Sequence, residues 1–121
     1  MQHGAQTYGK VANQTASQRE LEAALLLKAA SRLQAVHDGW DRKRDELADA
    51  LLYNRRLWTI FMASVAQEDN PLPREIRQGV ANLGLFVFRH TLSMIADPRP
   101  EYLGCLVNIN RQLAAGLQGR A

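Results

Sequence analysis

The side chains that could do chemistry are few and widely separated in this sequence. Its three histidines are His3, His37 and His90, and its single cysteine is Cys105. Zinc sites use Cys and His ligands at short, characteristic spacings, and these four residues show no such spacing. A single cysteine excludes an intrachain disulfide, and a lone cysteine in an amphipathic helix is far more often a packing residue than a nucleophile. We therefore expect no metal and no cofactor.

Enzymatic chemistry is not indicated either. The sequence has no glycine-rich phosphate loop, no Ser/His/Asp set around a nucleophile and no pair of carboxylates flanked by apolar walls on one helix face. We therefore predict no catalytic residues and a protein that is not an enzyme.

The basic residues form small clusters at residues 42–44, 55–56 and 74–77. The chain holds 15 Lys and Arg against 12 Asp and Glu, so its net charge of +3 is a mild excess. A dedicated nucleic-acid binder carries a denser basic field, and a single-strand binder usually adds an array of stacking aromatic side chains. Solvated helix faces explain the clusters best, and we expect no direct contact with RNA.

Length and composition indicate one soluble domain. The 121 residues are 46% hydrophobic and 22% charged, close to the average of globular proteins. The longest apolar stretch, residues 80–88, is far shorter than the roughly 20 residues that cross a bilayer. The N-terminus lacks the apolar core of a signal peptide. We expect a cytoplasmic protein without membrane insertion.

Helix signals divide the chain into a tail and one helical domain. Residues 1–16 show little periodicity and are expected to be a flexible tail, and residues 17–121 form the domain. The capping-box pattern of residues 17–20 predicts the first helix start, and Asp38-Gly39 predicts its end in the left-handed conformation that glycine adopts cheaply. Proline-containing turns at residues 69–73 and 97–100 separate the later helices. The predicted helices cover residues 17–37, 41–68, 73–96 and 101–118. With no hairpin signals and short connections, the fold class is all-α, a small antiparallel bundle of four helices.

Apolar residues recur at alternating steps of three and four in the last three predicted helices, as in the seams of a bundle. One polar residue interrupts each seam: Asn54, His90 and Asn110. Counting back from the turns at 1.5 Å per residue places Asn54 and His90 at nearly the same depth, and Asn110 fits that depth less well. We predict a structural polar seam of Asn54, Trp58, His90 and Asn110, with contact to a partner as the alternative for His90. The apolar seam positions are Leu47, Leu51, Phe61, Val65, Ile76, Val80, Leu83, Val87, Met94, Leu103, Leu106, Leu113 and Leu117.

Further apolar residues lie outside these seams. Leu57 and Ile60 lie off the main stripe of the second predicted helix, and the third helix carries a second stripe. Two wide apolar stripes on one helix indicate either a central helix or a groove that awaits another helix, and the sequence leaves both interpretations open. The second stripe consists of Leu85, Phe88, Leu92 and Ile95.

Three segments give the sequence a family resemblance. They are Asn54-Arg55-Arg56-Leu57-Trp58, the run from Leu83 to Thr91 (LGLFVFRHT) and the run from Val107 to Leu113 (VNINRQL). Together with Ser17–Ala23 at the opening of the first helix, they resemble the FlaF family of bacterial flagellar-biosynthesis regulators. The resemblance extends from about Tyr8 over nearly the whole chain. One departure is Gln18, where the family pattern would have proline.

The resemblance implies a function in flagellin production. It implies a cytoplasmic, non-enzymatic factor that binds flagellin in a chaperone-like manner, promotes flagellin synthesis and secretion, and opposes FlbT. The alternative is a post-transcriptional regulator that acts on flagellin mRNA through FlbT or by direct RNA contact. Motif positions off the seams are then expected to bind the partner, together with one residue of the second stripe. These residues are Arg55, Phe86, Phe88, Arg89, Asn108 and Arg111.

Overall fold

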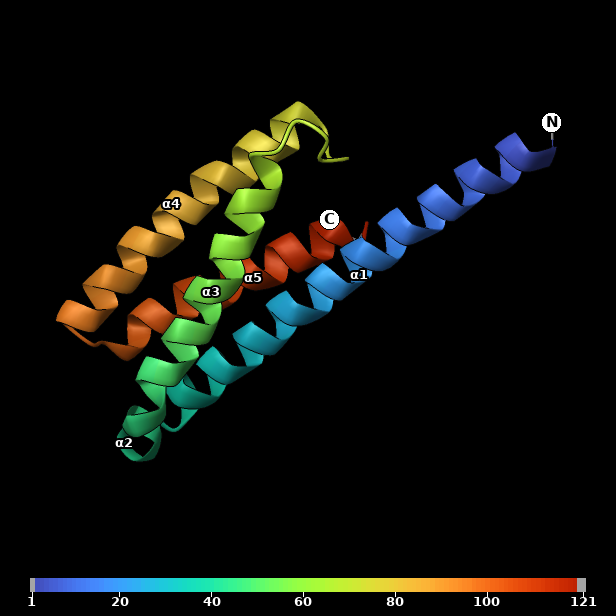
Figure 1. Ribbon diagram of the computed structural model, residues 1–121. Helices are drawn as coiled ribbons and strands as arrows, with labels where there is room; N and C mark the ends of the chain where they lie inside the picture. Colours follow the sequence, from blue (N-terminus) through green and yellow to red (C-terminus); the bar gives the residue numbers. More distant parts are fainter. Residues whose placement is uncertain (1, 120–121) are drawn as a thin grey trace.

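The structure, a computed structural model, describes the backbone of residues 2–119 and the side chains of residues 17–119. Within residues 2–119 the chain forms helices and no strand, so the predicted all-α fold with four long helices is confirmed (Figure 1). The elements are α1 (Gln2–Asp38), α2 (Trp40–Lys43), a 3₁₀ turn (Arg44–Glu46), α3 (Leu47–Val65), α4 (Arg74–Ala96) and α5 (Pro100–Leu117).

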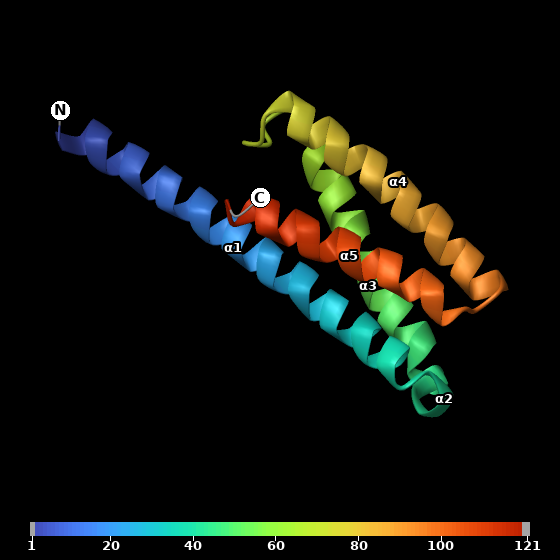
Figure 2. The same ribbon diagram turned by 180° about the vertical axis from the view of Figure 1, so that it is seen from behind.

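Helix α1 begins at Gln2 rather than at Ser17, so the predicted helix start is wrong. Ser17 is exposed, and the side chain of Gln18 donates a hydrogen bond to Glu22 at 3.2 Å. That pair is one helical turn apart, an arrangement typical of a helix interior rather than of a cap. Residues 2–16 of the expected tail form turns of α1 that extend beyond the other helices (Figures 1 and 2), and their mobility stays a prediction.

Gly39 ends α1 as predicted, but not in the expected conformation. Its φ is −107°, outside the left-handed region, and its N–H donates to the carbonyl oxygen of Ala35 at 3.0 Å. The chain then turns through α2 and the 3₁₀ turn, so the long second helix predicted from residue 41 is interrupted before α3. Helices α4 and α5 begin and end within one residue of the prediction, because Pro73 and Pro100 set their first turns.

The four long helices form two packed pairs: α1 with α5, which have the more extensive contact, and α3 with α4. Helices α1 and α5 run antiparallel and side by side, and α3 packs across α1 (Figures 1 and 2). Helix α4 packs on α3 and has little contact with α5. Both views show α4 and α5 joined by the short link at residues 97–99 and diverging from it. Helix α4 is therefore a peripheral helix, and this finding excludes the central-helix interpretation of its second stripe.

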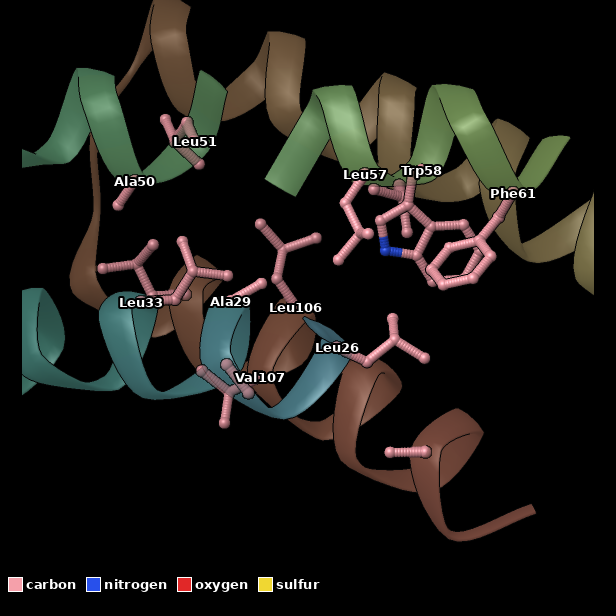
Figure 3. Packing of buried hydrophobic residues seen from close by; sticks show 14 of the residues in the cluster. Leu26, Ala29, Leu33, Ala50, Leu51, Leu57, Trp58, Phe61, Leu106 and Val107 are labelled. Carbon is pink, nitrogen blue, oxygen red and sulfur yellow. The ribbon is translucent and has the colours of Figure 1, made fainter. Parts of the chain in front are cut away.

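The core lies between α1, α3 and α5. Trp58 is fully buried there, with its ring directed toward the helices below α3 (Figure 3), and it packs edge to face on Phe61 with centroids 6.1 Å apart. The seam predicted for α3 is buried at every position. Leu57 is also buried, at 6% exposure, so its assignment to surplus surface is wrong, whereas Ile60 is 64% exposed. The other large, fully buried apolar residues are Leu26, Leu33, Val87, Met94, Leu103 and Leu106.

At two positions of α4 the buried residue is the one that follows the predicted seam residue. Gly84 and Thr91 are buried in place of the predicted Leu83 and His90. A Cβ added at Gly84 would overlap the Sδ of Met62, so the glycine lets α3 and α4 approach closely. The hydroxyl of Thr91 donates to the carbonyl oxygen of Val87 at 2.7 Å, which satisfies its buried polar group. Small residues thus form the α3–α4 contact, and the larger Leu83 and His90 turn toward α5.

The turn between α3 and α4 is held by side-chain hydrogen bonds. The amide nitrogen of Asn70 donates to both the carbonyl oxygen and the hydroxyl of Ser64 at 3.1 Å, and its Oδ1 accepts the backbone N–H of Leu72 at 3.0 Å. The guanidinium of Arg77 reaches back to the carbonyl oxygen of Gln67 at 2.9 Å. These bonds satisfy carbonyl groups at the end of α3 and fix the position of Leu72 beside α4.

We expect the change Asn70→Ala to lower the free energy of unfolding by about 1–2 kcal/mol, because three hydrogen bonds of a half-buried amide are lost together. Urea denaturation followed by circular dichroism measures the change. Asn82→Ala is the control, since Asn82 is exposed and accepts only from Gln78 in the structure. Equal stability of the two variants would contradict the role given to Asn70.

Helix α4 is long and apolar enough to cross a membrane by length and composition, although we expected no such segment. Polar residues such as Asn82 interrupt the apolar run of residues 80–88, but the mean hydropathy over the whole helix stays high, and the absence of membrane insertion stays a prediction. Core helices of soluble domains pass the same test, and α4 packs one face on α3. Only 28% of its most apolar window is buried, and its exposed large apolar residues are Ile76, Leu83, Leu85, Phe86, Leu92 and Ile95.

Candidate functional site

An apolar groove lies between α4 and α5 in the described part of the chain. It has a volume of about 470 Å³ and is open to solvent. We call it the α4–α5 groove. Apolar side chains make up nearly all of its lining, and the two polar exceptions are Arg19 of α1 and Gln112 of α5. Its lining residues are Arg19, Leu72, Pro73, Ile76, Leu83, Ile109, Gln112, Leu113, Gly116 and Leu117.

The groove follows from the divergence of the two helices. Ile76 and Leu83 lie two turns apart on one face of α4 and are 49% and 36% exposed. Leu113 and Leu117 lie one turn apart on the facing side of α5 and are half-buried. We predicted all four as seam residues, and they do face one another across the gap between α4 and α5. The gap is too wide to close, so these residues line a groove rather than a sealed core.

At the opposite end, an aromatic cluster closes the junction of α4 and α5. The Nε2–H of His90 donates to the backbone carbonyl oxygen of Tyr102 at 2.8 Å. Phe86 stacks on the His90 ring with centroids 5.4 Å apart, and Tyr102 meets that ring edge to face. The guanidinium of Arg99 lies 6.0 Å from the Tyr102 ring. Because the carbonyl oxygen can only accept, the bond fixes the His90 tautomer with hydrogen on Nε2.

A separate polar network lies in the core. Asn110 Oδ1 accepts the indole N–H of Trp58 at 3.0 Å, and its Nδ2 donates to Asn54 Oδ1 at 2.7 Å and to the carbonyl oxygen of Leu26 at 3.4 Å. The predicted seam thus contains Asn54, Trp58 and Asn110, but not His90. The predicted depth match between Asn54 and His90 is wrong as a contact, because His90 points to α5 and Thr91 occupies the buried position.

The residues predicted to bind a partner do not form one surface. Arg55 and Phe88 line a common hollow of about 280 Å³ between α3 and α4, beside Leu92 and Ile95 of the second stripe. Phe86 belongs to the junction cluster and is 45% exposed. The remaining three are exposed on α4 and α5, and none of the six lines the α4–α5 groove. These three are Arg89, Asn108 and Arg111.

The sequence patterns mark four lining residues of the groove as seam positions but do not predict the groove itself. They do not mark Ile109, and Arg19 belongs only to the capping-box pattern of residues 17–20. The sequence feature related to the groove is the pair of small residues Gly84 and Thr91. Because both are small, α4 lies close to α3 and away from α5. Apolar periodicity does not register such small residues, so the seam was assigned to their larger neighbours.

The titratable groups with shifted pKa values lie outside the groove. Hydrogen bonds from His37 and Gln34 lower the pKa of the Asp38 carboxyl at the end of α1. The carboxylate of Asp97, 2.8 Å from the Arg99 Nε, raises the pKa of that guanidinium. Among residues 17–119, whose side chains the structure describes, no group of three or more His, Cys, Asp and Glu side chains is placed to hold a metal ion. What the groove offers is apolar contact area, which suits the binding of an apolar partner surface.

Comparison with known proteins identifies the family. The family described as flagellar protein FlaF matches residues 4–117, nearly the whole chain. No match is found among curated proteins or among solved structures. The matched range contains all three segments on which the resemblance was based, at residues 54–58, 83–91 and 107–113. The chain therefore belongs to the FlaF family of flagellar proteins.

Proposed function

We propose that this protein binds flagellin in the cytoplasm as a chaperone-like factor without enzymatic activity, and so promotes flagellin synthesis and secretion. The observation that carries the proposal is the α4–α5 groove in a chain of a flagellar family. An open apolar groove between two helices is the usual receptor for the apolar face of a third, amphipathic helix. The terminal segments of flagellin are amphipathic helices once ordered, so one of them is the proposed occupant.

The exposed surface of α4 supports this mode of binding. Soluble monomers rarely expose large contiguous apolar patches unless the patch binds something. Ile76 and Leu83 line the groove and are about half and a third exposed, and Leu113 and Leu117 line it from α5. A helix laid between these rows would bury apolar side chains from both helices, and each fully buried Leu or Ile contributes about 1.5–3 kcal/mol.

The proposal is tested by titration calorimetry with purified flagellin. We expect the double change Ile76→Gln with Leu83→Gln to weaken binding about tenfold or more, because both side chains lose apolar contact in the bound state. The matched control is Ile60→Gln with Leu85→Gln, since these residues are similarly exposed on α3 and α4 but do not line the groove. Both double variants should keep the helicity of the parent protein.

Two results would contradict the proposal. Absence of binding by the folded parent protein at micromolar concentration would reject flagellin as the partner. Weakening by Leu92→Gln with Ile95→Gln, without an effect of the groove pair, would move binding to the hollow between α3 and α4, which these two residues line.

A further inference from the structure

Among the residues whose side chains the structure describes, none provides a counter-charge for Arg19 at one end of the α4–α5 groove. Arg19 lies on α1 and lines the groove together with Leu117 of α5 and Ile76 of α4. Its Nε has no accessible surface and no hydrogen-bond partner among the described side chains. A buried donor of a charged group that lacks an acceptor is costly, so such a group is expected to find a partner in the functional complex.

The chain itself offers no acid to fill this role within the described range. No ion pair joins Arg19 to a carboxylate in residues 17–119, and Glu22, one turn further along α1, accepts the side-chain amide of Gln18. Residues 1–16 contain no Asp or Glu at all. Apart from Gln112, the remaining lining residues of the groove are apolar, so no acidic side chain of the lining competes for the guanidinium.

We propose that the groove takes an amphipathic helix whose apolar stripe ends at an Asp or Glu, and that this carboxylate pairs with Arg19. The inference rests on the proposed function and deepens it, because it specifies which chemistry the bound segment of flagellin carries. An arginine guanidinium presents planar paired donors that match a carboxylate, and the low polarity of the groove strengthens such a pair. A charge at one end of an apolar groove also fixes the direction and register of the bound helix.

The experiment measures flagellin binding by calorimetry for the full-length protein and three variants. Arg19→Met keeps the apolar stem but removes the charge, Arg19→Lys keeps the charge but removes the paired donors, and Arg56→Met is the control on the exposed face of α3. We expect the affinity to fall about tenfold for Arg19→Met, less for Arg19→Lys and not at all for Arg56→Met. The difference between the parent protein and Arg19→Met should shrink at high salt.

A charge exchange identifies the partner residue. Each acidic residue in the bound terminal helix of flagellin is replaced in turn by its amide. At the position that pairs with Arg19, this replacement should lower the affinity of the parent protein but cause no further loss of affinity in Arg19→Met. Arg19→Glu combined with Arg at that flagellin position should restore binding.

The outcomes separate this inference from the function on which it rests. If the parent protein does not bind flagellin, both fail. If it binds and Arg19→Met binds equally well, the groove function stands and the role of Arg19 is rejected. If the protein alone forms a dimer that Arg19→Met dissociates, a second copy of the chain occupies the groove, and the proposed helix is also rejected.

Discussion

Replacing Asn110 by Ala should lower the free energy of unfolding by about 3–5 kcal/mol, a large part of the stability of a domain of this size. Asn110 is fully buried and joins three helices through its side chain. Its Oδ1 accepts from Trp58 of α3, and its Nδ2 donates to Asn54 of α3 and to a carbonyl oxygen of α1. The substitution would leave both the buried indole N–H and the buried Asn54 Oδ1 without this partner and would add a cavity.

Asn54→Ala should cost clearly less than Asn110→Ala, although both residues are fully buried amides. The Nδ2 of Asn54 has no hydrogen-bond partner among the described residues, so removing this side chain also removes an unsatisfied donor. Asn110 would keep its bond to Trp58 and to the carbonyl oxygen of Leu26. Alanine is also the better residue within a helix.

Urea denaturation, followed by circular dichroism and by tryptophan fluorescence, measures both changes. Asn108→Ala is the matched control, because Asn108 is exposed on the same helix and accepts only from Gln112, so its effect should stay within about 0.5 kcal/mol. Equal costs for Asn54→Ala and Asn110→Ala would show that the network is not centred on Asn110.

The sequence sufficed to predict the helices and the buried face of α3. Six positions of α3 from Leu47 to Val65 follow steps of three and four, and all six are buried. Prolines at the turns predicted the start of α4 and α5 to within one residue, because proline fixes φ and lacks the N–H that a helix interior needs. These features depend on local chemistry, which the sequence displays directly.

Apolar periodicity alone could not predict the α4–α5 groove, because the groove depends on how far α4 and α5 stand apart. Sequence periodicity predicts Leu83 and His90 in a closed seam, but the structure buries Gly84 and Thr91 instead and turns Leu83 and His90 toward α5. Apolar periodicity contains no information on the distance between two helices. The distance between α4 and α5 depends on their different partners, because α4 packs on α3 whereas α5 packs on α1. Ile76 and Leu83 therefore face α5 from across an open space.

The contact that positions α4 gives the second large prediction. We expect Gly84→Ala to lower the free energy of unfolding by about 1–3 kcal/mol, even though alanine favours a helix over glycine. The new Cβ would overlap the Sδ of Met62 and lie 2.8 Å from its Cγ, so the whole side chain must move rather than its tip alone. Met62 is half-buried between the two helices, and a shift of α4 away from α3 is the other route to relief.

Gly79→Ala is the matched control for Gly84→Ala, because it makes the same change within α4 where nothing lies within 4 Å of the added Cβ. It should raise the free energy of unfolding by about 0.5–1 kcal/mol. A double-mutant cycle tests the mechanism by denaturation of Gly84→Ala, Met62→Ala and the variant with both changes. Together, the two changes should lower the free energy of unfolding by less than the sum of their separate effects. Additive costs would mean that Met62 does not set the approach of α3 and α4. Coupling, together with altered flagellin affinity of Gly84→Ala, would tie the width of the groove to this one contact on the opposite side of α4.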